Sequence, residues 1–422
     1  MDRRRRRFLA VGAAACASIA GGCAAGPPAR PRATVAVVGG GYGGATAAKY
    51  VRMLDPTIAV VLVEPEEAFV SCPLSNLVLG GFRTMADITT PYASLERRHG
   101  VRHVRDRATA IDMDRREVRL ARGDRIAFER VIVAPGIDYM WDLMPAMKDP
   151  AVRESLPIAF KAGPETMALR RRLEAMPDGG VFVIAIPETP YRCPPAPYER
   201  ACQAAAYFRR AKPRAKIVVA DANGEIASKG ALFHRAWSEL YAGMIDYRPN
   251  SKAVDVDVAT STVKLELEDV KGDVLNVLPP MKAAAIADPF VTANRRWCEV
   301  DWLTYESHAA PRAHVIGDAL FPAPLMPKSG HMANAHGKAC AAAVVALIAG
   351  ERPNPAPTLT STCYSFFSDS LAAHVASVHK YDLVERTMKP VPGSGGVSAA
   401  MSAIEARYGY EWARNIWADT LG

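Results

Sequence analysis

The chain has 422 residues, of which 50 % are hydrophobic and 23 % are charged. This composition is that of a globular protein with two or three domains, and it excludes a chain without hydrophobic cores. The formal net charge is +8, and five arginines and one aspartate in residues 1–25 supply half of it. The remainder is only mildly basic, which gives no case for a nucleic acid partner, and no metal site is expected.

The first 25 residues have the three parts of an export signal. Arg3–Arg7 form a basic start, Phe8–Ala20 an apolar stretch too short to span a bilayer, and residues 21–25 are small. The arginine run indicates the twin-arginine route, which carries folded proteins, so we expect a periplasmic protein that acquires its cofactor before export. Two alternatives stay open: a basic tail ahead of a buried helix, and lipidation at Cys23.

A strand, a glycine-rich turn and a helix follow the signal. Thr34–Val38 is an apolar run typical of a buried parallel strand, Ala45–Leu54 is helical, and Ile58–Val63 is a second strand that ends at Glu64. Three glycines between the first strand and the helix fit the G-x-G-x-x-G pattern of a dinucleotide site: Gly39, Gly41 and Gly44. They allow a tight turn, the approach of a pyrophosphate and close helix packing, and Glu64 can accept hydrogen bonds from a ribose.

Two later segments favour FAD over NAD as the bound dinucleotide. Val131–Gly136 resembles the second flavin motif of flavoproteins with two dinucleotide domains. His314–Asp318 resembles the third, in which the aspartate, here Asp318, binds the ribityl chain. The helix after Lys328-Ser-Gly would point its positive end at the flavin pyrimidine ring, so we expect Lys328 to belong to the flavin site.

A second strand–helix–strand unit lacks a nucleotide site. A helix over 164–176 precedes the strand Val181–Ile186, and a helix over 198–210 and a strand over 217–220 follow. The turn after Val181–Ile186 contains five prolines, which have no N–H to offer a pyrophosphate, and Glu188 would repel one. We therefore expect this unit to keep the fold without binding a nicotinamide, so that electrons enter or leave by another route.

The rest of the chain completes an α/β architecture. Strands over 274–278 and 314–316 and an Ala-rich helix over 332–349 are followed by a Pro-rich linker from Glu351 and an aromatic C-terminal region. We expect two Rossmann-like dinucleotide-binding-type domains plus a C-terminal α+β domain, with no transmembrane span after the signal. The expected parts are the signal (1–25), the FAD-binding domain in two parts (33–160 and 286–350), a degenerate NAD-like domain carrying Cys193 (161–285), and a C-terminal flavin-facing or interface domain (355–422).

Six cysteines remain after the signal, and three of them have the surroundings of small buried residues. Cys202 and Cys340 lie in Ala-rich helices, and Cys298 stands beside Trp297. Free cysteines in such surroundings pack as small hydrophobic groups. We expect these three to act as small buried residues, and a redox role stays open as the alternative for Cys298.

The other three cysteines are candidates for chemistry. Cys193 lies in a chain stiffened by prolines, Glu199 follows it where a carboxyl could hold or move a proton, and Cys363 comes first after the linker. For Cys193 and Cys363, a buried thiol or a purely structural disulfide is the alternative to a redox pair. Cys72, on the path from Glu64 toward the flavin ring, is either a buried thiol or a covalent flavin anchor.

Short segments along the chain resemble the flavoprotein subunit of flavocytochrome c sulfide dehydrogenase. They are Val-Val-Gly-Gly-Gly-Tyr-Gly-Gly-Ala-Thr-Ala-Ala-Lys-Tyr (37–50), Ser-Cys-Pro-Leu-Ser-Asn (71–76), Tyr-Arg-Cys-Pro-Pro-Ala-Pro-Tyr-Glu-Arg-Ala (191–201), Val-Ile-Gly-Asp-Ala (315–319), Met-Pro-Lys-Ser-Gly (326–330), Asn-Ala-His-Gly-Lys (334–338) and Thr-Cys-Tyr-Ser (362–365). That family is similar to the sulfide:quinone oxidoreductases but works in the periplasm with a c-type cytochrome subunit.

The resemblance implies a role for each candidate residue. Cys72 corresponds to the cysteine linked to the flavin by a thioether, Cys193 and Cys363 to a redox-active disulfide, Glu199 to the acid beside it, and Trp412 to an aromatic near flavin and substrate. The implied reaction is oxidation of hydrosulfide to zero-valent sulfur or polysulfide through the disulfide and FAD. Electrons then pass to a c-type cytochrome, whose haem belongs to the partner because this chain has no C-x-x-C-H.

Two other functions are weighed against this one. A sulfide:quinone oxidoreductase should carry amphipathic C-terminal helices with a basic, Trp- or Leu-lined face. Glu405–Thr420 has mixed charge and several aromatics, which suits a protein interface better. A non-catalytic flavin-binding or assembly subunit is the third reading, and the presence of Cys193, Glu199 and Cys363 argues against it.

Overall fold

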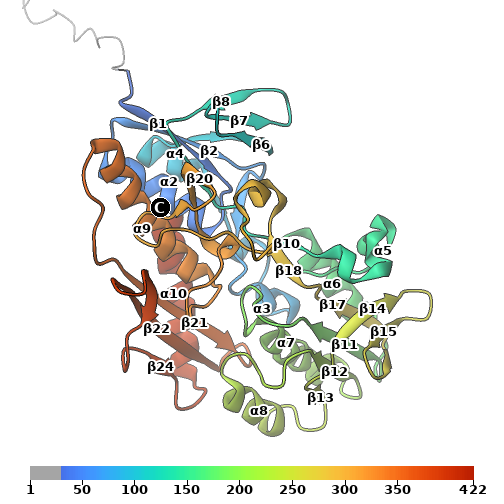
Figure 1. Cartoon of the computed structure of the whole chain (residues 1–422). Coiled ribbons are helices and arrows are strands. Elements are labelled where there is room, and N and C mark those ends of the chain that lie inside the picture. The colour runs from blue at the N-terminus through green and yellow to red at the C-terminus, as the bar shows by residue number, and fades with distance from the viewer. Residues whose placement is uncertain (1–29) are drawn as a thin grey trace, which may run out of the picture. The chain divides into compact units, whose positions relative to one another are not determined.

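The computed structural model describes residues 30–422, so the expected export signal and Cys23 lie outside the described residues. Within the unit Ala33–Gly422, a six-stranded sheet has the order β19-β20-β9-β1-β2-β5. Figure 1 labels three of its strands, β1, β2 and β20. Its strands are β1 (Ala33–Val38), β2 (Ile58–Val63), β5 (Arg102–Val104), β9 (Arg130–Val133), β19 (Glu306–Ser307) and β20 (Ala310–Val315). β9 pairs in parallel with both β1 and β20, so two distant stretches of the chain build one sheet, as expected for a divided FAD-binding domain.

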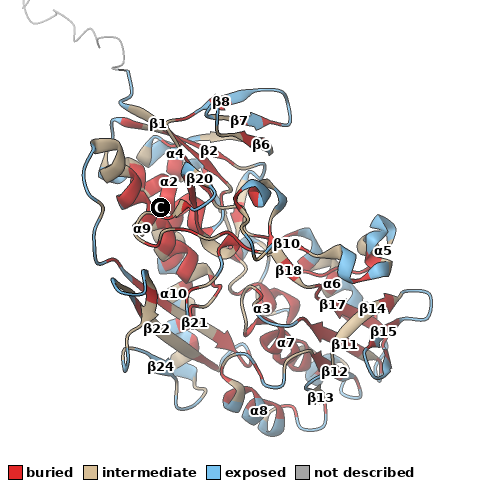
Figure 2. Cartoon of the chain, viewed as in Figure 1, coloured by how far each residue is buried: buried red, intermediate tan, exposed pale blue. Residues whose placement is uncertain are grey.

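Two long helices cover this sheet in succession. α2 (Tyr42–Leu54) packs on β1 and β2, and α9 (Gly330–Ala349) packs on α2. A Cβ added to Gly337 of α9 would lie 2.6 Å from the carbonyl oxygen of Gly43, so the two helices cross with their backbones in contact. Figure 2 shows this region largely in the buried class, which explains why the strands read as continuous apolar runs.

The expected second unit is a separate parallel sheet with the order β13-β12-β11-β17. Its strands and helices are α6 (Pro164–Ala175), β11 (Val181–Ile186), α7 (Ala196–Ala211), β12 (Lys216–Asp221), α8 (Gly230–Glu239), β13 (Ile245–Arg248) and β17 (Val274–Val277). The predicted strands and helices of both units begin and end within four residues of the observed ones, which confirms the α/β class. The exact domain boundaries stay a prediction.

Short elements with antiparallel pairing were not predicted. One three-stranded sheet contains β6 (Ala108–Asp112), β7 (Glu117–Leu120) and β8 (Arg125–Ala127). Another contains β14 (Ala253–Asp257), β15 (Thr262–Leu265) and β16 (Asp269–Lys271). Two further pairs are β3 (Ala68–Val70) with β4 (Thr89–Pro91), and β10 (Ile137–Tyr139) with β18 (Met281–Ala283). Strands of three to five residues give too short an alternation of apolar and polar side chains to recognise in sequence.

The remaining helices in the described chain are also short. The α-helices are α3 (Ser75–Leu79), α4 (Ala93–His99) and α5 (Pro150–Ser155). The 3₁₀ helices are η1 (Ala86–Ile88), η2 (Trp141–Leu143), η3 (Pro145–Lys148), η4 (Ala285–Phe290) and η5 (Gly317–Ala319). Of these, α3 and η5 follow directly on two expected site segments, those of Cys72 and Asp318.

The C-terminal region is α+β, as predicted. It contains β21 (Thr358–Phe366), β22 (Ala372–Asp382), β23 (Thr387–Pro390), β24 (Gly396–Val397) and α10 (Ala403–Leu421). α10 returns to α2, where the Lys49 ammonium donates to the carbonyl oxygens of Ala418 and Asp419, both at 3.0 Å. One face of the segment expected to be an interface is therefore already packed against the chain itself.

Among the described helices, α9 is long and apolar enough to cross a membrane by length and composition. Half of that apolar window is buried inside the protein, and a core helix of this kind meets the same criteria. The expectation that no segment after the signal spans a membrane stays a prediction.

Candidate active site

The glycine-rich turn forms a cradle at the N-terminus of α2. Gly39 has a φ of +97°, and a Cβ on Gly44 would lie 1.8 Å from its carbonyl oxygen, so both positions require glycine. A Cβ on Gly41 would meet nothing within 4 Å, and the first turn of α2 carries no acidic side chain. This open space over free helix N–H groups fits a pyrophosphate.

Glu64 stands where a ribose-binding acid is expected. Its Oε2 accepts a hydrogen bond from the Gly40 N–H at 2.7 Å, and its Oε1 accepts one from the Glu66 N–H at 3.1 Å. Backbone donors thus orient the carboxylate beside the glycine turn, and each oxygen keeps a lone pair for a ligand hydroxyl. Gly39, Gly41, Gly44 and Glu64 together fit the adenosine half of FAD.

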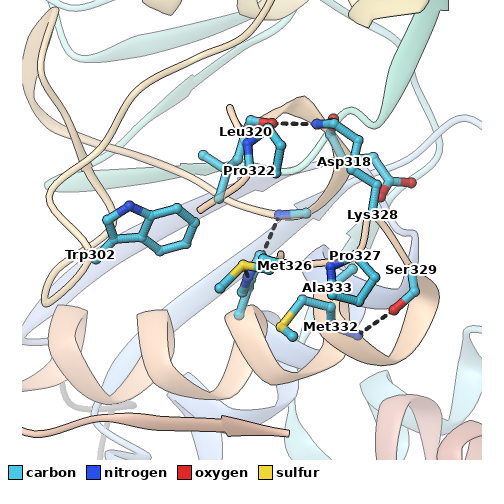
Figure 3. Close-up of a pocket in the computed structure, with 12 residues that line it drawn as sticks. Trp302, Asp318, Leu320, Pro322, Met326, Pro327, Lys328, Ser329, Met332 and Ala333 are labelled. Carbon is cyan, nitrogen blue, oxygen red and sulfur yellow. Dashed lines mark hydrogen bonds between the residues drawn. The ribbon is translucent and has the colours of Figure 1, made fainter. Parts of the chain in front are cut away.

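Asp318 and Lys328 lie together in a second pocket, drawn in Figure 3. The Lys328 ammonium donates to the carbonyl oxygen of Asp318 at 2.9 Å and to that of Leu320, and it lies 3.6 Å from the centre of the Trp297 ring. Burial lowers the pKa of Lys328 to about 7, so its charge responds to an anion bound beside it. α9 begins two residues later, capped by the Ser329 side chain, which accepts from the Met332 N–H.

Three cysteines far apart in sequence line one cavity. Cys72, Cys193 and Cys363 share its wall with Glu199 and Trp412. An adjoining cavity has four of these residues in its own wall, namely the three cysteines and the tryptophan. That second cavity also reaches Asp318 and Lys328, so the cysteines and the third flavin motif face connected space.

Cys193 is held in a constrained backbone conformation. Its φ is +51°, its N–H donates to the carbonyl oxygen of Lys328 at 2.7 Å, and its own carbonyl accepts from the Ala196 N–H at the start of α7. Cys363 lies in the middle of β21, opposite Val375. Both cysteines are thiols in this structure, and burial raises the pKa of each, by more for Cys193.

Glu199 connects the three cysteine segments. Its Oε1 accepts from the Phe366 N–H of β21 at 2.8 Å, and its Oε2 accepts from the Asn76 side-chain amide of α3 at 2.9 Å. Burial raises the pKa of Glu199 above that of an ordinary glutamate, although these two hydrogen bonds oppose the shift. The carboxyl can therefore keep its proton at a pH where an exposed glutamate has lost it.

Two arginines of the site were not predicted from the sequence. Arg200 is buried and donates to the side-chain oxygens of Asn276 at 2.5 Å and Asn76 at 3.3 Å. Arg192 donates to the Cys72 sulfur at 3.1 Å and approaches the Asp318 carboxylate to 3.4 Å. The position of Arg192 next to Cys193 was the one available signal, whereas Arg200 looks in sequence like the polar face of a helix.

In the second sheet, internal donors engage the acid that would bind a nucleotide ribose. Asp221 ends β12, where a dinucleotide domain carries its ribose-binding acid. Its Oδ2 accepts from the Tyr198 hydroxyl at 2.6 Å and the Tyr247 hydroxyl at 3.0 Å, and its Oδ1 accepts from the Asn223 N–H at 2.9 Å. Internal donors occupy both oxygens, in agreement with the proline-rich turn ahead of α7.

The remaining cysteines are buried, as predicted. Cys202 in α7 and Cys340 in α9 have no exposed surface, and neither has Cys298. The Cys202 sulfur accepts a hydrogen bond from the Trp237 indole at 3.2 Å. None of the three lines the cavity shared by Cys72, Cys193 and Cys363.

The fold and the site define a flavin-dependent disulfide oxidoreductase. In agreement, a model of the pyridine nucleotide-disulphide oxidoreductase family matches residues 33–152. Two further models match later segments: sulfide dehydrogenase [flavocytochrome c] flavoprotein chain, central (166–279), and flavocytochrome c sulphide dehydrogenase, flavin-binding (355–421). The sulfide dehydrogenase flavoprotein chain of Chlorobaculum thiosulfatiphilum is 68 % identical over 44 residues, which are 10 % of this chain and 92 % of that sequence. The chain belongs to the family of flavocytochrome c sulfide dehydrogenase flavoprotein chains, oxidoreductases that act on sulfide with a flavin.

More distant relatives share the fold. The mitochondrial sulfide:quinone oxidoreductase of Mus musculus is 24 % identical over 327 residues, covering 74 % of this chain and 71 % of the mouse sequence. The solved sulfide:quinone oxidoreductase of Aquifex aeolicus superposes with a TM-score of 0.73 at 18 % identity, covering 92 % and 91 % of the two chains. The NAD-dependent persulfide reductase of A. fulgidus gives a TM-score of 0.62 at 13 % identity, covering 92 % and 77 %.

NADH and NADPH should fail to reduce the flavin of the purified holoprotein. The proline-rich turn offers no phosphate cradle, and tyrosine hydroxyls occupy the acid that would bind the adenosine ribose of a nicotinamide dinucleotide. The measurement is anaerobic flavin absorbance after addition of each nucleotide, with dithionite as the positive control. Rapid bleaching by either nucleotide would show that this unit is a working nucleotide site.

Proposed function

We propose that this chain is the flavoprotein subunit of a periplasmic sulfide dehydrogenase, exported folded by the twin-arginine route. It oxidises hydrosulfide to zero-valent sulfur or polysulfide and passes the electrons to a c-type cytochrome subunit. The observation that carries the proposal is the meeting of Cys193, Cys363 and Glu199 in one cavity that adjoins Asp318. A disulfide between Cys193 and Cys363 is the proposed reactive group.

The residues for FAD are those of the two cradles. Gly39, Gly41 and Gly44 would take the pyrophosphate, Glu64 a ribose, and Asp318 the ribityl chain, with Lys328 supporting the turn that carries Asp318. When bound, FAD supplies an acceptor for an electron pair that can be returned one electron at a time to a haem. The Cys72 sulfur, which accepts from Arg192 and from the Ala162 N–H at 3.3 Å, is the proposed covalent attachment point.

The protein's own residues account for the sulfur chemistry. Hydrosulfide attacks one sulfur of the Cys193–Cys363 disulfide, a new S–S bond forms, and the old one breaks to leave a persulfide and a thiolate. Glu199 can donate a proton to the departing sulfur or take one from the persulfide, because burial keeps its pKa high.

A sulfide:quinone oxidoreductase is the second candidate, favoured by the likeness to the mouse enzyme over most of both chains. Against it, part of the apolar surface of α10, including Ala406, Ala413 and Ile416, is buried inside the protein. The exposed side carries ionised residues such as Glu411 and Arg414, which pair with each other. This arrangement supports a protein electron acceptor more than a lipid surface.

Acid-precipitated wild-type protein should stay yellow, and Cys72→Ser should release its flavin into the supernatant. The reason is that Cys72 lies in both cavities, with two donors directed at its sulfur. Cys340→Ala, which removes a buried thiol outside the cavities, is the matched control and should retain the flavin. Free flavin in the wild-type supernatant would contradict the covalent attachment while leaving FAD binding itself intact.

Sulfide should bleach the flavin of the wild-type protein under anaerobic conditions, and ferric cytochrome c should restore its colour faster than a soluble quinone. Cys363→Ser should keep the flavin spectrum but slow reduction by sulfide at least ~100-fold, because the disulfide that hydrosulfide attacks can no longer form. A merely structural disulfide predicts a different result: stability falls by about 2–5 kcal/mol and the flavin remains reducible. Normal reduction of the Cys363→Ser variant by sulfide would refute the mechanism.

Glu199→Gln should have a smaller effect than Cys363→Ser, and one that depends on pH. A raised glutamate pKa means that the protonated, donating form persists above the ordinary range and is lost as the pH rises through the raised value. The wild-type rate per hydrosulfide ion should therefore fall across that range, while the rate of the variant stays flat. Stopped-flow reduction from acid to alkaline pH tests this, and parallel profiles for the two proteins would remove Glu199 from proton handling.

A further inference from the structure

Lys229 is a buried cation behind the cysteine cavity. It lies between β12 and α8 with 6 % of its surface exposed, and its backbone adopts a φ of +58°. Its ammonium donates to the carbonyl oxygen of Cys363 at 3.3 Å. Within residues 30–422 this ammonium forms no ion pair with a carboxylate, so the cation is buried mainly against the strand that carries Cys363.

The two cysteines of the proposed disulfide face different charges. Burial raises the pKa of the Cys363 thiol, Lys229 opposes this effect by lowering the pKa, and Glu199 raises the pKa further. The Cys193 sulfur is buried beside three groups that oppose a negative charge, namely Cys363, Glu199 and Cys72, and one that favours it, Arg192. Arg192 is shared with Cys72 and Asp318, whereas the one carboxyl that acts together with Lys229 on the Cys363 sulfur is Glu199.

Glu199 is the remaining titratable neighbour, and it faces both Lys229 and Arg200. Each of these two cations lowers the pKa of Glu199, but burial outweighs them and the carboxyl keeps a raised pKa. A protonated Glu199 does not neutralise Lys229. The positive charge is therefore available to a second group, and the Cys363 sulfur on β21 is that group.

We propose that Lys229 is a positioning residue that stabilises negative charge on the Cys363 sulfur, which makes Cys363 the leaving thiolate and Cys193 the sulfur that hydrosulfide attacks. In this step the hydrosulfide sulfur bonds to Cys193 Sγ, and the bond from Cys193 Sγ to Cys363 Sγ breaks. The electron pair of the broken bond stays on Cys363 Sγ, and the proton of hydrosulfide stays on the new persulfide. The direction of attack rests on the disulfide of the proposed function.

The alternative is that Lys229 only ties the turn before α8 to β21 through the carbonyl oxygen of Cys363. A tie of this kind would affect stability without changing the ionisation of the Cys363 thiol. The two roles differ in the reactivity of the reduced protein, because only the thiolate is nucleophilic. That reactivity is measurable without sulfide turnover.

The experiment measures alkylation of each cysteine in the dithiothreitol-reduced holoprotein by iodoacetamide, from acid to alkaline pH, with mass spectrometry of the peptides. In the wild type, Cys363 should react with a lower pH midpoint than Cys193. In Lys229→Gln the Cys363 rate at neutral pH should fall about tenfold, which corresponds to one unit of thiol pKa. Lys229→Arg should restore most of the rate, and Lys216→Gln, which removes an exposed lysine of β12, should leave it unchanged.

Several outcomes would overturn the proposal. If Cys363 is alkylated at an unchanged rate in a folded Lys229→Gln protein, Lys229 has only a structural role. If Lys229→Gln does not fold, the wild-type and Lys229→Arg profiles decide, and a lower midpoint for Cys193 than for Cys363 refutes the assigned direction. Peptide mapping of the unreduced wild type tests the proposed function separately. Absence of the Cys193–Cys363 disulfide would refute the proposed function, whereas the order in which the reduced cysteines are alkylated tests only the role of Lys229.

Discussion

The close crossing of α2 and α9 is the constraint on which the cofactor site depends. Gly337 brings the backbone of α9 against Gly43, and a Cβ on Gly330 would lie 2.8 Å from the Tyr42 ring, so the two helices also begin side by side. Their N-termini carry the positive ends of two helix dipoles. The pyrophosphate of a flavin dinucleotide is negative, and its ring becomes negative on reduction, so each is stabilised by a positive helix N-terminus. The single contact between α2 and α9 positions both N-termini.

Around this core, a buried hydrogen-bond network holds the sulfur chemistry in place. Glu199 and Asn76 join the helix after Cys193, the helix after Cys72 and the strand of Cys363, and Arg200 extends the network to Asn276. A network of this type is stable only when its members are satisfied, which limits movement of the cysteines. Glu199 holds these segments together through its hydrogen bonds. Its burial raises its pKa, which allows it to carry a proton.

The second parallel sheet shows how a nucleotide-type unit can serve another purpose. Its acid, Asp221, binds tyrosines of the same unit, and the turn that would cradle phosphates instead holds Cys193 against the Lys328 segment through a 2.7 Å hydrogen bond. The proline-rich turn is rigid because each proline restricts its own φ and the residue before it. A loop of fixed shape suits a reactive cysteine better than it suits a nucleotide.

The sequence by itself determined the fold class, the glycine cradle with Glu64, the position of Asp318 and the separation of the six cysteines into buried and candidate groups. These features are local, because strand periodicity, a required positive φ at Gly39 and prolines without N–H groups act within a few residues. Only the tertiary structure decided that Cys72, Cys193 and Cys363 share a cavity, and that Arg200 and Lys229 are buried cations. In the sequence, Arg200 has the pattern of a solvated position on a helix face, and Lys229 that of a solvated position in a turn. Their role depends on contacts with residues more than 50 positions away, which no local pattern encodes.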